Sequence, residues 1–442
     1  MRKINIAIVV LLIVVFTYPL VQAQENKELW AASTYIQSAK IHYQHVYKKS
    51  RLREDLYHCI DLLKEGADRF GHVPQFYYMI GTFYAEINAI DTVVAYYDSV
   101  AAFCEDESID KKHRKNCYKK ENYIKKMKKQ RLDFWEKSYN SAIEYIGQYD
   151  QVTDMRANSP EDSISIYDSL TNKAFDLAMS DFKMALTAQP GDTTTLIGMA
   201  ALYQRQNMHK EAIDLYYQIK DIKGEDGDIV NRIAYAHISL EDWENSRDWF
   251  LKLEGYIPDD INTLVNLSVI FNRLGDYDKW NEYIEKVLAL EPENKQFLFN
   301  GGQYWFIKMQ EVATNDTTLA KEYMLNAKGK FEKLIEIDPN DTDGLKQLGI
   351  LNLLNAQPEE AIAPLEKYME LMPFDQDVMD FLSRAYIMTE NWDKAITVYE
   401  KMVENDSGNT DAWERLCELY GFNKMQDKAD EACARVEELK KL

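Results

Sequence analysis

Small residues recur with a fixed period along residues 193–442. Seven windows begin at positions 193, 227, 261, 295, 342, 376 and 410, and only the fourth carries an insertion. Their common spacing of about 34 residues is that of a stacked helical repeat. One column is small throughout: Ala200, Ala234, Ser268, Gly302, Gly349, Ser383 and Cys417. A second column is small in every window but one: Ala212, Ser246, Trp280, Ala327, Ala361, Ala395 and Ala429. Mainly apolar and aromatic residues three and four places away, with departures such as Asn352, complete an amphipathic helix around each column.

Proline and short polar residues separate the predicted helices. Pro190, Pro258, Pro292, Pro339 and Pro373 lie on the same register, and Asp or Asn follows each within two positions. Proline stops a helix, and the side chain of Asp or Asn caps the start of the next one. Each window therefore predicts two antiparallel helices, whose small columns let them approach closely.

These columns resemble the tetratricopeptide repeat (TPR), whose pattern of W, L-G, Y, A, F, A and P marks two packed helices. Residues 342–375 carry the pattern as Leu345, Leu348-Gly349, Ala361, Leu365 and Pro373. The resemblance implies an all-α fold: a right-handed TPR superhelix, or α-solenoid of antiparallel helix pairs, with about nine or ten repeats.

The N-terminal part of the chain follows this pattern less closely. Windows 40–73 and 74–107 fit it, and a long, partly basic helix is expected over 111–148. Residues 150–165 are rich in Asp, Ser, Asn and Thr, which favours an exposed loop. The predicted organisation is a signal peptide at 1–23, divergent TPR-like helices at 24–149, an exposed loop and helix start at 150–173, and a regular array at 174–442.

The N-terminal segment 1–23 has the pattern of a secretory signal. Arg2 and Lys3 precede an apolar run, and Val21-Gln22-Ala23 resembles a cleavage site. We expect cleavage after Ala23 and an exported protein, either periplasmic or secreted. The alternative is an uncleaved N-terminal anchor, which would make the chain a membrane-tethered adaptor in contact with the bilayer.

Composition and motifs argue against several classes of protein. Gly and Pro together make up 27 of 442 residues, about half the average share, which disfavours an all-β fold. The net charge of −21 disfavours a nucleic-acid partner. No phosphate-binding loop, zinc-protease helix or nucleophile elbow occurs. The sequence therefore predicts no enzyme, no catalytic or metal site and no cofactor.

One stretch departs from the acidic background. Residues 111–131 contain eleven Lys or Arg and one acidic residue. Two interpretations stay open: a helix whose basic faces pair with acidic neighbours, or a docking patch for an acidic partner or an anionic membrane surface.

Five cysteines in an exported chain can form disulfides and leave one thiol over. Cys417 and Cys433 fall in columns that face each other within the last repeat, so we predict a disulfide between them. Cys104 and Cys117 are the second candidate pair. The alternative is that the thiols fill buried core positions.

The TPR resemblance implies a protein-protein interaction scaffold similar to bacterial periplasmic TPR proteins, which assemble envelope complexes. First helices line the concave face of such arrays. The predicted partner-binding groove is Arg205, Asn231, Arg232, Tyr235, Asn262, Asn266, Arg273, Phe299, Gln303, Phe306, Lys346, Arg384 and Ile387. Amides and aromatic rings suit an extended peptide, and the cations suit a carboxylate. The alternative is that these side chains are only solvated.

Overall fold

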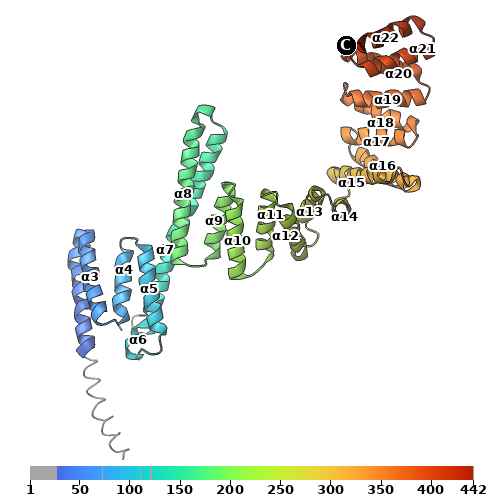
Figure 1. Ribbon diagram of the computed structural model, residues 1–442. Helices are drawn as coiled ribbons and strands as arrows, with labels where there is room; N and C mark the ends of the chain where they lie inside the picture. The colour runs from blue at the N-terminus through green and yellow to red at the C-terminus, as the bar shows by residue number, and fades with distance from the viewer. Residues whose placement is uncertain (1–26, 72, 110, 120–121, 442) are drawn as a thin grey trace, which may run out of the picture. The chain divides into compact units, whose positions relative to one another are not determined.

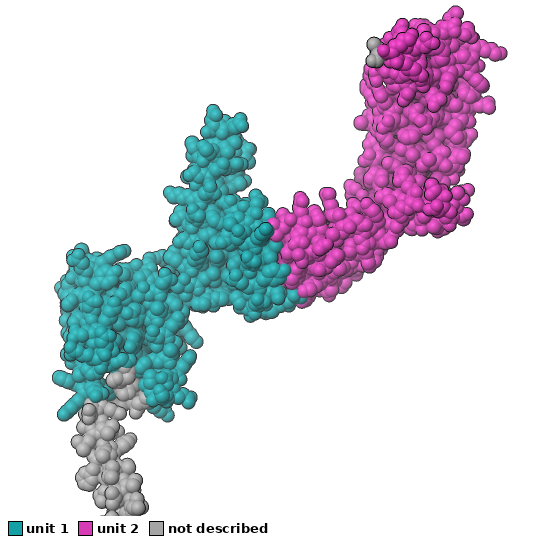
Figure 2. All heavy atoms as spheres, viewed as in Figure 1, with its two compact units in different colours: residues 1–225 teal, residues 226–442 magenta. Residues whose placement is uncertain are grey.

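The computed structural model describes residues 27–71, 73–109, 111–119 and 122–441. The predicted signal peptide lies outside the described residues. All regular secondary structure in the described residues is helical, which confirms the predicted all-α class. The chain divides into two compact units, residues 1–225 (unit 1) and residues 226–442 (unit 2), coloured separately in Figure 2.

Unit 1 contains four helix pairs within the described residues (Figure 1). The first joins a helical segment at 27–50 to α3. The others are α4 with α5, α7 with α8, and α9 with α10, and a short extra helix, α6, follows α5. The bounds are α3 Arg53–Arg69, α4 Pro74–Ala85, α5 Ile90–Glu105, α6 Lys111–Tyr118, α7 Tyr123–Ala157, α8 Ile164–Ala188, α9 Thr193–Arg205 and α10 His209–Lys223.

The expected long helix over 111–148 is wrong, because α6 ends at Tyr118 and a separate helix, α7, begins at Tyr123. Asn122 has a left-handed backbone with φ of 49°, and its side chain accepts a hydrogen bond from Lys125 N, which starts α7 afresh. A disulfide between Cys104 and Cys117 ties α6 to the end of α5. The basic stretch is therefore divided between two helices.

The expected exposed loop and helix start at 150–173 is longer than the one in the structure. Helix α7 continues to Ala157, a short 3-10 turn covers Glu161–Ser163, and α8 begins at Ile164. Figure 1 shows the far end of this long hairpin extending beyond the α9/α10 pair. Its polar side chains face solvent, as in the Arg156–Asp168 ion pair. The polar composition that predicted a loop over residues 150–165 instead reflects the solvent exposure of the ends of two helices.

Unit 2 contains six consecutive helix pairs within the described residues, as the period predicts. Together with the four of unit 1 they confirm the predicted nine or ten repeats. The pairs are α11 Gly227–Ser239 with α12 Trp243–Tyr256, α13 Ile261–Leu274 with α14 Tyr277–Leu290, α15 Lys295–Val312 with α16 Thr317–Ile337, α17 Thr342–Leu354 with α18 Pro358–Leu371, α19 Gln376–Met388 with α20 Trp392–Asn405, and α21 Thr410–Phe422 with α22 Gln426–Leu439. The insertion in the fourth window lengthens α15 and α16 to 18 and 21 residues.

The predicted capping residues start the first helices of this unit. The side chains of Asp260, Asp341 and Asp375 accept hydrogen bonds from backbone N–H groups three positions on, at 2.8, 2.8 and 3.1 Å. Each bond satisfies a donor that has no partner within the helix. Short acceptor side chains after the prolines therefore fix where each repeat begins.

The small columns are buried because large side chains of the paired helix lie directly over them. A Cβ atom added to Gly302 would lie 2.5 Å from the ring of Phe331, which is fully buried. One added to Gly349 would lie 2.4 Å from the side chain of Leu365. In these two pairs, α15 with α16 and α17 with α18, close approach of the helices therefore depends on a residue without a side chain.

A polar triad repeats between successive pairs near the C-terminus. Glu366 Oε1 accepts hydrogen bonds from the hydroxyl of Tyr386 and from Lys394 Nζ at 3.0 Å. In the next repeat, Glu400 Oε1 accepts the equivalent bonds from Tyr420 and Lys428 at 2.6 and 3.0 Å. Each glutamate belongs to one repeat and its two donors to the following one, so the triad links neighbouring repeats.

These triads predict an acid-dependent loss of stability. Hydrogen bonds from Tyr386 and Tyr420 lower the pKa of Glu366 and Glu400. The two ionised glutamates therefore contribute fully to the stability of the folded state above the ordinary glutamate pKa. This contribution is lost as the pH falls through their lower pKa in the folded state. We expect E366Q/E400Q to reduce the fall in melting temperature between pH 7 and pH 3.5.

The matched control is E404Q/E437Q, which changes two exposed glutamates of the same unit. Scanning calorimetry at both pH values measures the difference. An equal reduction in both double variants would contradict a specific role of the triads.

Candidate functional site

The first helices of unit 2 expose one common face. In α19 the exposed residues are Asp377, Arg384 and Met388, at the second, ninth and thirteenth positions of the repeat. These positions lie within about 40° of one another on a helix of 3.6 residues per turn. The same positions are exposed in α11, which presents Asp228 and Tyr235. Successive first helices therefore offer a continuous surface to a partner.

All thirteen predicted groove residues lie on first helices. Arg205 ends α9 in unit 1, where it pairs with Asp150 at 2.8 Å. The other twelve belong to unit 2. Asn231, Arg232 and Tyr235 lie on α11; Asn262, Asn266 and Arg273 on α13; Phe299, Gln303 and Phe306 on α15; Lys346 on α17; and Arg384 and Ile387 on α19.

Two of these residues make direct contact across neighbouring repeats. Asn266 Nδ2 donates to the hydroxyl of Tyr235 at 2.9 Å and to the carbonyl of Asn262 at 2.7 Å. The Tyr235 ring stands edge-on to Phe250, with centroids 5.1 Å apart. The bond joins α11 to α13 at the exposed face and leaves the amide oxygen of Asn266 as a possible acceptor.

The cations expected to bind a carboxylate already have partners in the same unit. Lys346 bonds Asp375 at 3.0 Å, Arg384 bonds Asp380 at 2.7 Å, and Arg232 bonds Asp228 at 3.0 Å. Although desolvation opposes it, hydrogen bonds from Tyr368 and Lys346 lower the pKa of Asp375. The charges of these cations are therefore locally matched.

Two further groove residues contact aromatic side chains of the same unit. The Arg273 guanidinium lies over the Trp243 ring, 5.8 Å from its centroid. The Phe299 ring stands edge-on to Phe331 in the core, with centroids 5.7 Å apart. Arg273 consequently lies against the start of α12, in the preceding repeat.

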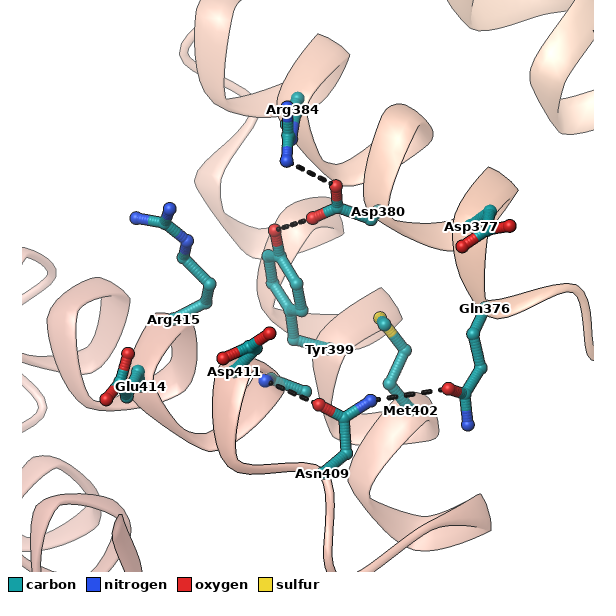
Figure 3. Close-up of a pocket in the computed structure, with 11 residues that line it drawn as sticks. Gln376, Asp377, Asp380, Arg384, Tyr399, Met402, Asn409, Asp411, Glu414 and Arg415 are labelled. Atoms are coloured by element: carbon teal, nitrogen blue, oxygen red, sulfur yellow. Dashed lines mark hydrogen bonds and ion pairs between the residues drawn. The ribbon is translucent and has the colours of Figure 1, made fainter. Parts of the chain in front are cut away.

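Sequence reasoning missed an acidic groove between α19 and α21. Figure 3 shows its lining, and its volume is about 440 Å³. The hydroxyl of Tyr399 donates to Asp380 Oδ1 at 3.0 Å, and Asp377, Asp411 and Glu414 also line the groove. The sequence could have indicated this groove, because the same position of three successive windows is occupied by Asp343, Asp377 and Asp411.

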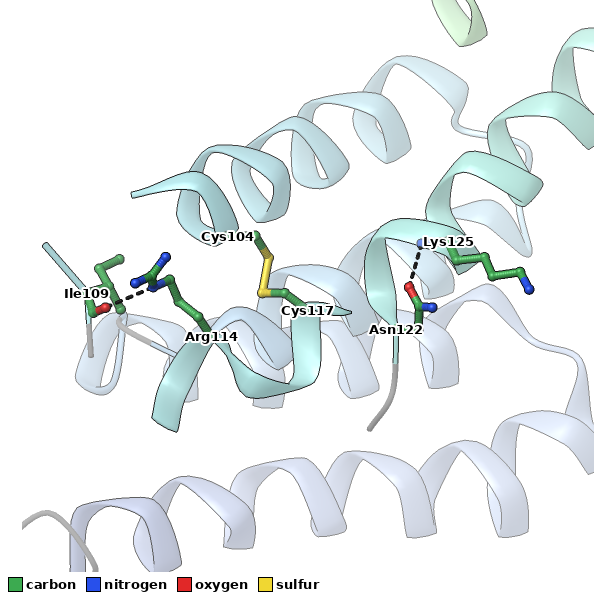
Figure 4. The surroundings of a disulfide bond; sticks show 6 residues. All are labelled: Cys104, Ile109, Arg114, Cys117, Asn122 and Lys125. Carbon is green, nitrogen blue, oxygen red and sulfur yellow. Dashed lines mark hydrogen bonds between the residues drawn. A yellow bond between two sulfur atoms is a disulfide. The ribbon is translucent and has the colours of Figure 1, made fainter. Parts of the chain in front are cut away.

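Both candidate cysteine pairs are joined in the structure. The Cα atoms of Cys417 and Cys433 are 5.0 Å apart, and those of Cys104 and Cys117, drawn in Figure 4, are 5.9 Å apart. Both separations lie within the range of protein disulfides. Cys59 is a free, buried thiol, and desolvation raises its pKa to about 11.

In the basic stretch, the lysines whose side chains the structure describes are exposed. Six of them form no ion pair within the described part of the chain: Lys111, Lys115, Lys119, Lys125, Lys128 and Lys129. Arg131 bonds Asp98 at 2.8 Å, and Arg114 Nε donates to the carbonyl of Ile109 at 2.9 Å, as Figure 4 shows. Pairing with acidic neighbours therefore accounts for little of this stretch.

A metal site and a membrane-spanning helix each place requirements on the described residues. Among the described residues, no group of three or more His, Cys, Asp or Glu side chains is arranged to hold a metal ion. No helix in that part of the chain has the length and hydropathy needed to cross a bilayer. His42 and His58 contact each other edge-on, with ring centroids 4.6 Å apart.

Comparison with known proteins agrees with the repeat architecture. The tetratricopeptide repeat model matches residues 261–294. A sol locus transcriptional repressor of Clostridium acetobutylicum is 35% identical over 88 residues, which are 20% of this chain and 24% of the relative. The general transcriptional corepressor trfA of Dictyostelium discoideum is 22% identical over 118 residues, which are 26% of this chain and 8% of the relative. The matches thus span a quarter or less of these two proteins.

Solved structures with similar stretches include two further proteins. The MamA protein is 21% identical with a TM-score of 0.35, over 41% of this chain and 92% of its own. YrrB, described as a TPR protein with an unusual peptide-binding site, is 16% identical with a TM-score of 0.35, over 45% of this chain and 96% of its own.

Proposed function

We propose that this chain, which is built from tetratricopeptide repeats, is a non-enzymatic scaffold that binds an extended segment of a partner protein along the first helices α11, α13 and α15. The repeat fold itself supports a role in protein-protein interaction. The observation that carries the proposal is the exposed contact between Tyr235 and Asn266, which combines a flat ring with an amide on neighbouring helices.

The surroundings of this contact fit an extended peptide. Tyr235 is 38% exposed and Val269, one repeat further on, is 46% exposed. Gln303 follows at the same register on α15. Amide groups can donate to and accept from a peptide backbone, while the ring and the valine cover apolar side chains. Binding would thus depend little on charge in this part of unit 2.

A paired substitution tests this surface. V269D/Q303R places a charge at the equivalent position of two successive repeats, on α13 and α15. We expect this variant to lose capture of the native partner. The partner itself is identified by cross-linking to the wild-type chain. The control L251D/E322R also introduces one Asp and one Arg, at exposed positions of α12 and α16, and is expected to retain capture. Full capture by a correctly folded V269D/Q303R variant would place the interaction elsewhere.

We further propose that the scaffold acts outside the cytoplasm. The signal-like pattern of residues 1–23 and the two cysteine pairs support this location, because disulfides persist in oxidising compartments. N-terminal sequencing of the exported protein is expected to begin at Gln24. A chain recovered in membranes with its N-terminus intact would instead support the membrane-tethered adaptor.

A further inference from the structure

The last three first helices carry a row of exposed apolar side chains. Leu354, Met388 and Phe422 end α17, α19 and α21 at the same position of successive repeats, and they are 57%, 52% and 69% exposed. The equivalent residues of α11 and α13 are Ser239 and Arg273. Large exposed apolar side chains that recur on successive elements of one surface are typical of an interaction site.

One member of the apolar row is held in place by the preceding repeat. The Phe422 ring packs on the Trp392 ring, with centroids 4.8 Å apart. A fixed, exposed ring loses little conformational entropy when a partner covers it, which is the property of an anchoring residue.

An acidic row lies at the other end of the same three helices. Asp343, Asp377 and Asp411 are exposed, and they form no hydrogen bond or ion pair in the described residues. They precede the apolar residues by eleven positions, so both rows lie on one face of each helix, about 16 Å apart. Between them, the groove that Figure 3 shows is lined by Asp380 and Glu414 and by Arg384 and Arg415, whose charges are paired with Asp380 and Glu418.

Charge decides which partner fits these two rows. Residues 226–442 contain 23 Lys and Arg against 43 Asp and Glu, a net charge of −20. First-turn aspartates stabilise their own helices, but helix stability gives no reason for the exposed apolar row. A partner that covers both rows must therefore present basic and apolar surface side by side.

We propose that the face formed by α17, α19 and α21 binds a basic amphipathic helix of a partner protein. An α-helix with side chains is about 10–12 Å across, which fits between rows about 16 Å apart. Its apolar stripe covers Leu354, Met388 and Phe422, and its lysines or arginines face the three aspartates. This mode of binding seats a helix in a groove through a few apolar anchors. The site is separate from the surface around Tyr235 and Asn266.

The test uses a synthetic 18-residue helix of leucine and lysine as probe, with a glutamate version of the same pattern as its counterpart. Fluorescence anisotropy with the full chain is expected to show binding of the lysine peptide that weakens as salt rises, and no binding of the glutamate peptide. D343N/D377N/D411N and L354S/M388S/F422S are each expected to weaken binding at least tenfold, while V269D/Q303R leaves it unchanged.

The matched control is E359Q/D393N/D427N. It removes the same number of charges from the first turns of the second helices α18, α20 and α22, again at one position of successive repeats. Equal losses in the two acidic triple variants would mean that the peptide only senses net charge, and would overturn the proposal. A dimeric chain in light scattering that L354S/M388S/F422S converts to monomer would also overturn it, because a second copy would then cover this face. Circular dichroism checks that each variant is folded.

Discussion

Phe331→Ala is expected to lower the free energy of local unfolding around α15 and α16 by about 3–5 kcal/mol, because the ring is fully buried and its removal leaves a cavity. The ring lies over Gly302, which has no side chain of its own to fill the space. Hydrogen exchange of the amides in α15 and α16 measures the effect, since each repeat of an array opens partly independently.

Gly302→Ala tests the same contact from the opposite side. In the wild-type chain the new methyl group would lie 2.5 Å from the Phe331 ring, and overpacking of this kind costs about 1–3 kcal/mol. In the F331A background the obstruction is gone, so the higher helix propensity of alanine should stabilise the pair by up to about 1 kcal/mol. The sign of the substitution thus depends on residue 331.

Gly329→Ala is the control, because Gly329 is exposed on α16 and no atom lies within 4 Å of its missing Cβ. It should stabilise the helix by about 0.5–1 kcal/mol in either background. If Gly302→Ala stabilised the wild-type chain as Gly329→Ala does, then close packing against Phe331 would not explain why residue 302 is small.

The repeat register was predictable because its causes are local. Small residues, capping side chains and apolar stripes act within one helix pair, so each window shows them separately. Ser268 and Ala361 are buried as their columns predict, and Asp260 and Asp341 cap helices. Seven windows repeat the same physical requirement, so departures such as Trp280 do not obscure it.

The exact site surface was less predictable because its contacts lie between repeats. Lys346 is paired with Asp375 of the same window. Arg273, however, lies over the Trp243 ring, and Tyr235 bonds Asn266, each in another window. Side-chain direction decides these contacts, and column spacing does not specify it. The tip of the α7/α8 hairpin was predicted as a loop for a different reason, since its side chains are polar and face solvent.

Removing the disulfide of the last repeat is the second large effect that we expect. C417S/C433S opens a loop of 16 residues, and a bridge of about this size contributes about 3 kcal/mol in the loop-entropy account. The loss should be confined to α21 and α22, because a terminal repeat has a neighbour on one side only. Hydrogen exchange of α22 amides in the oxidised chain measures it, with C104S/C117S as the control that changes α5 and α6 instead.

The Cys417–Cys433 disulfide is also expected to affect peptide binding to the proposed helix-binding face. Helix α21 carries Asp411 and Phe422, one member of each row. Opening of the last repeat therefore removes a third of both rows, and C417S/C433S should weaken the binding of the lysine-leucine peptide, as a reducing agent should in the wild-type chain. C104S/C117S should leave peptide binding unchanged. Unchanged exchange of α22 after loss of the bond would show that packing of Leu416, Tyr420 and Ala432 suffices to hold the final pair.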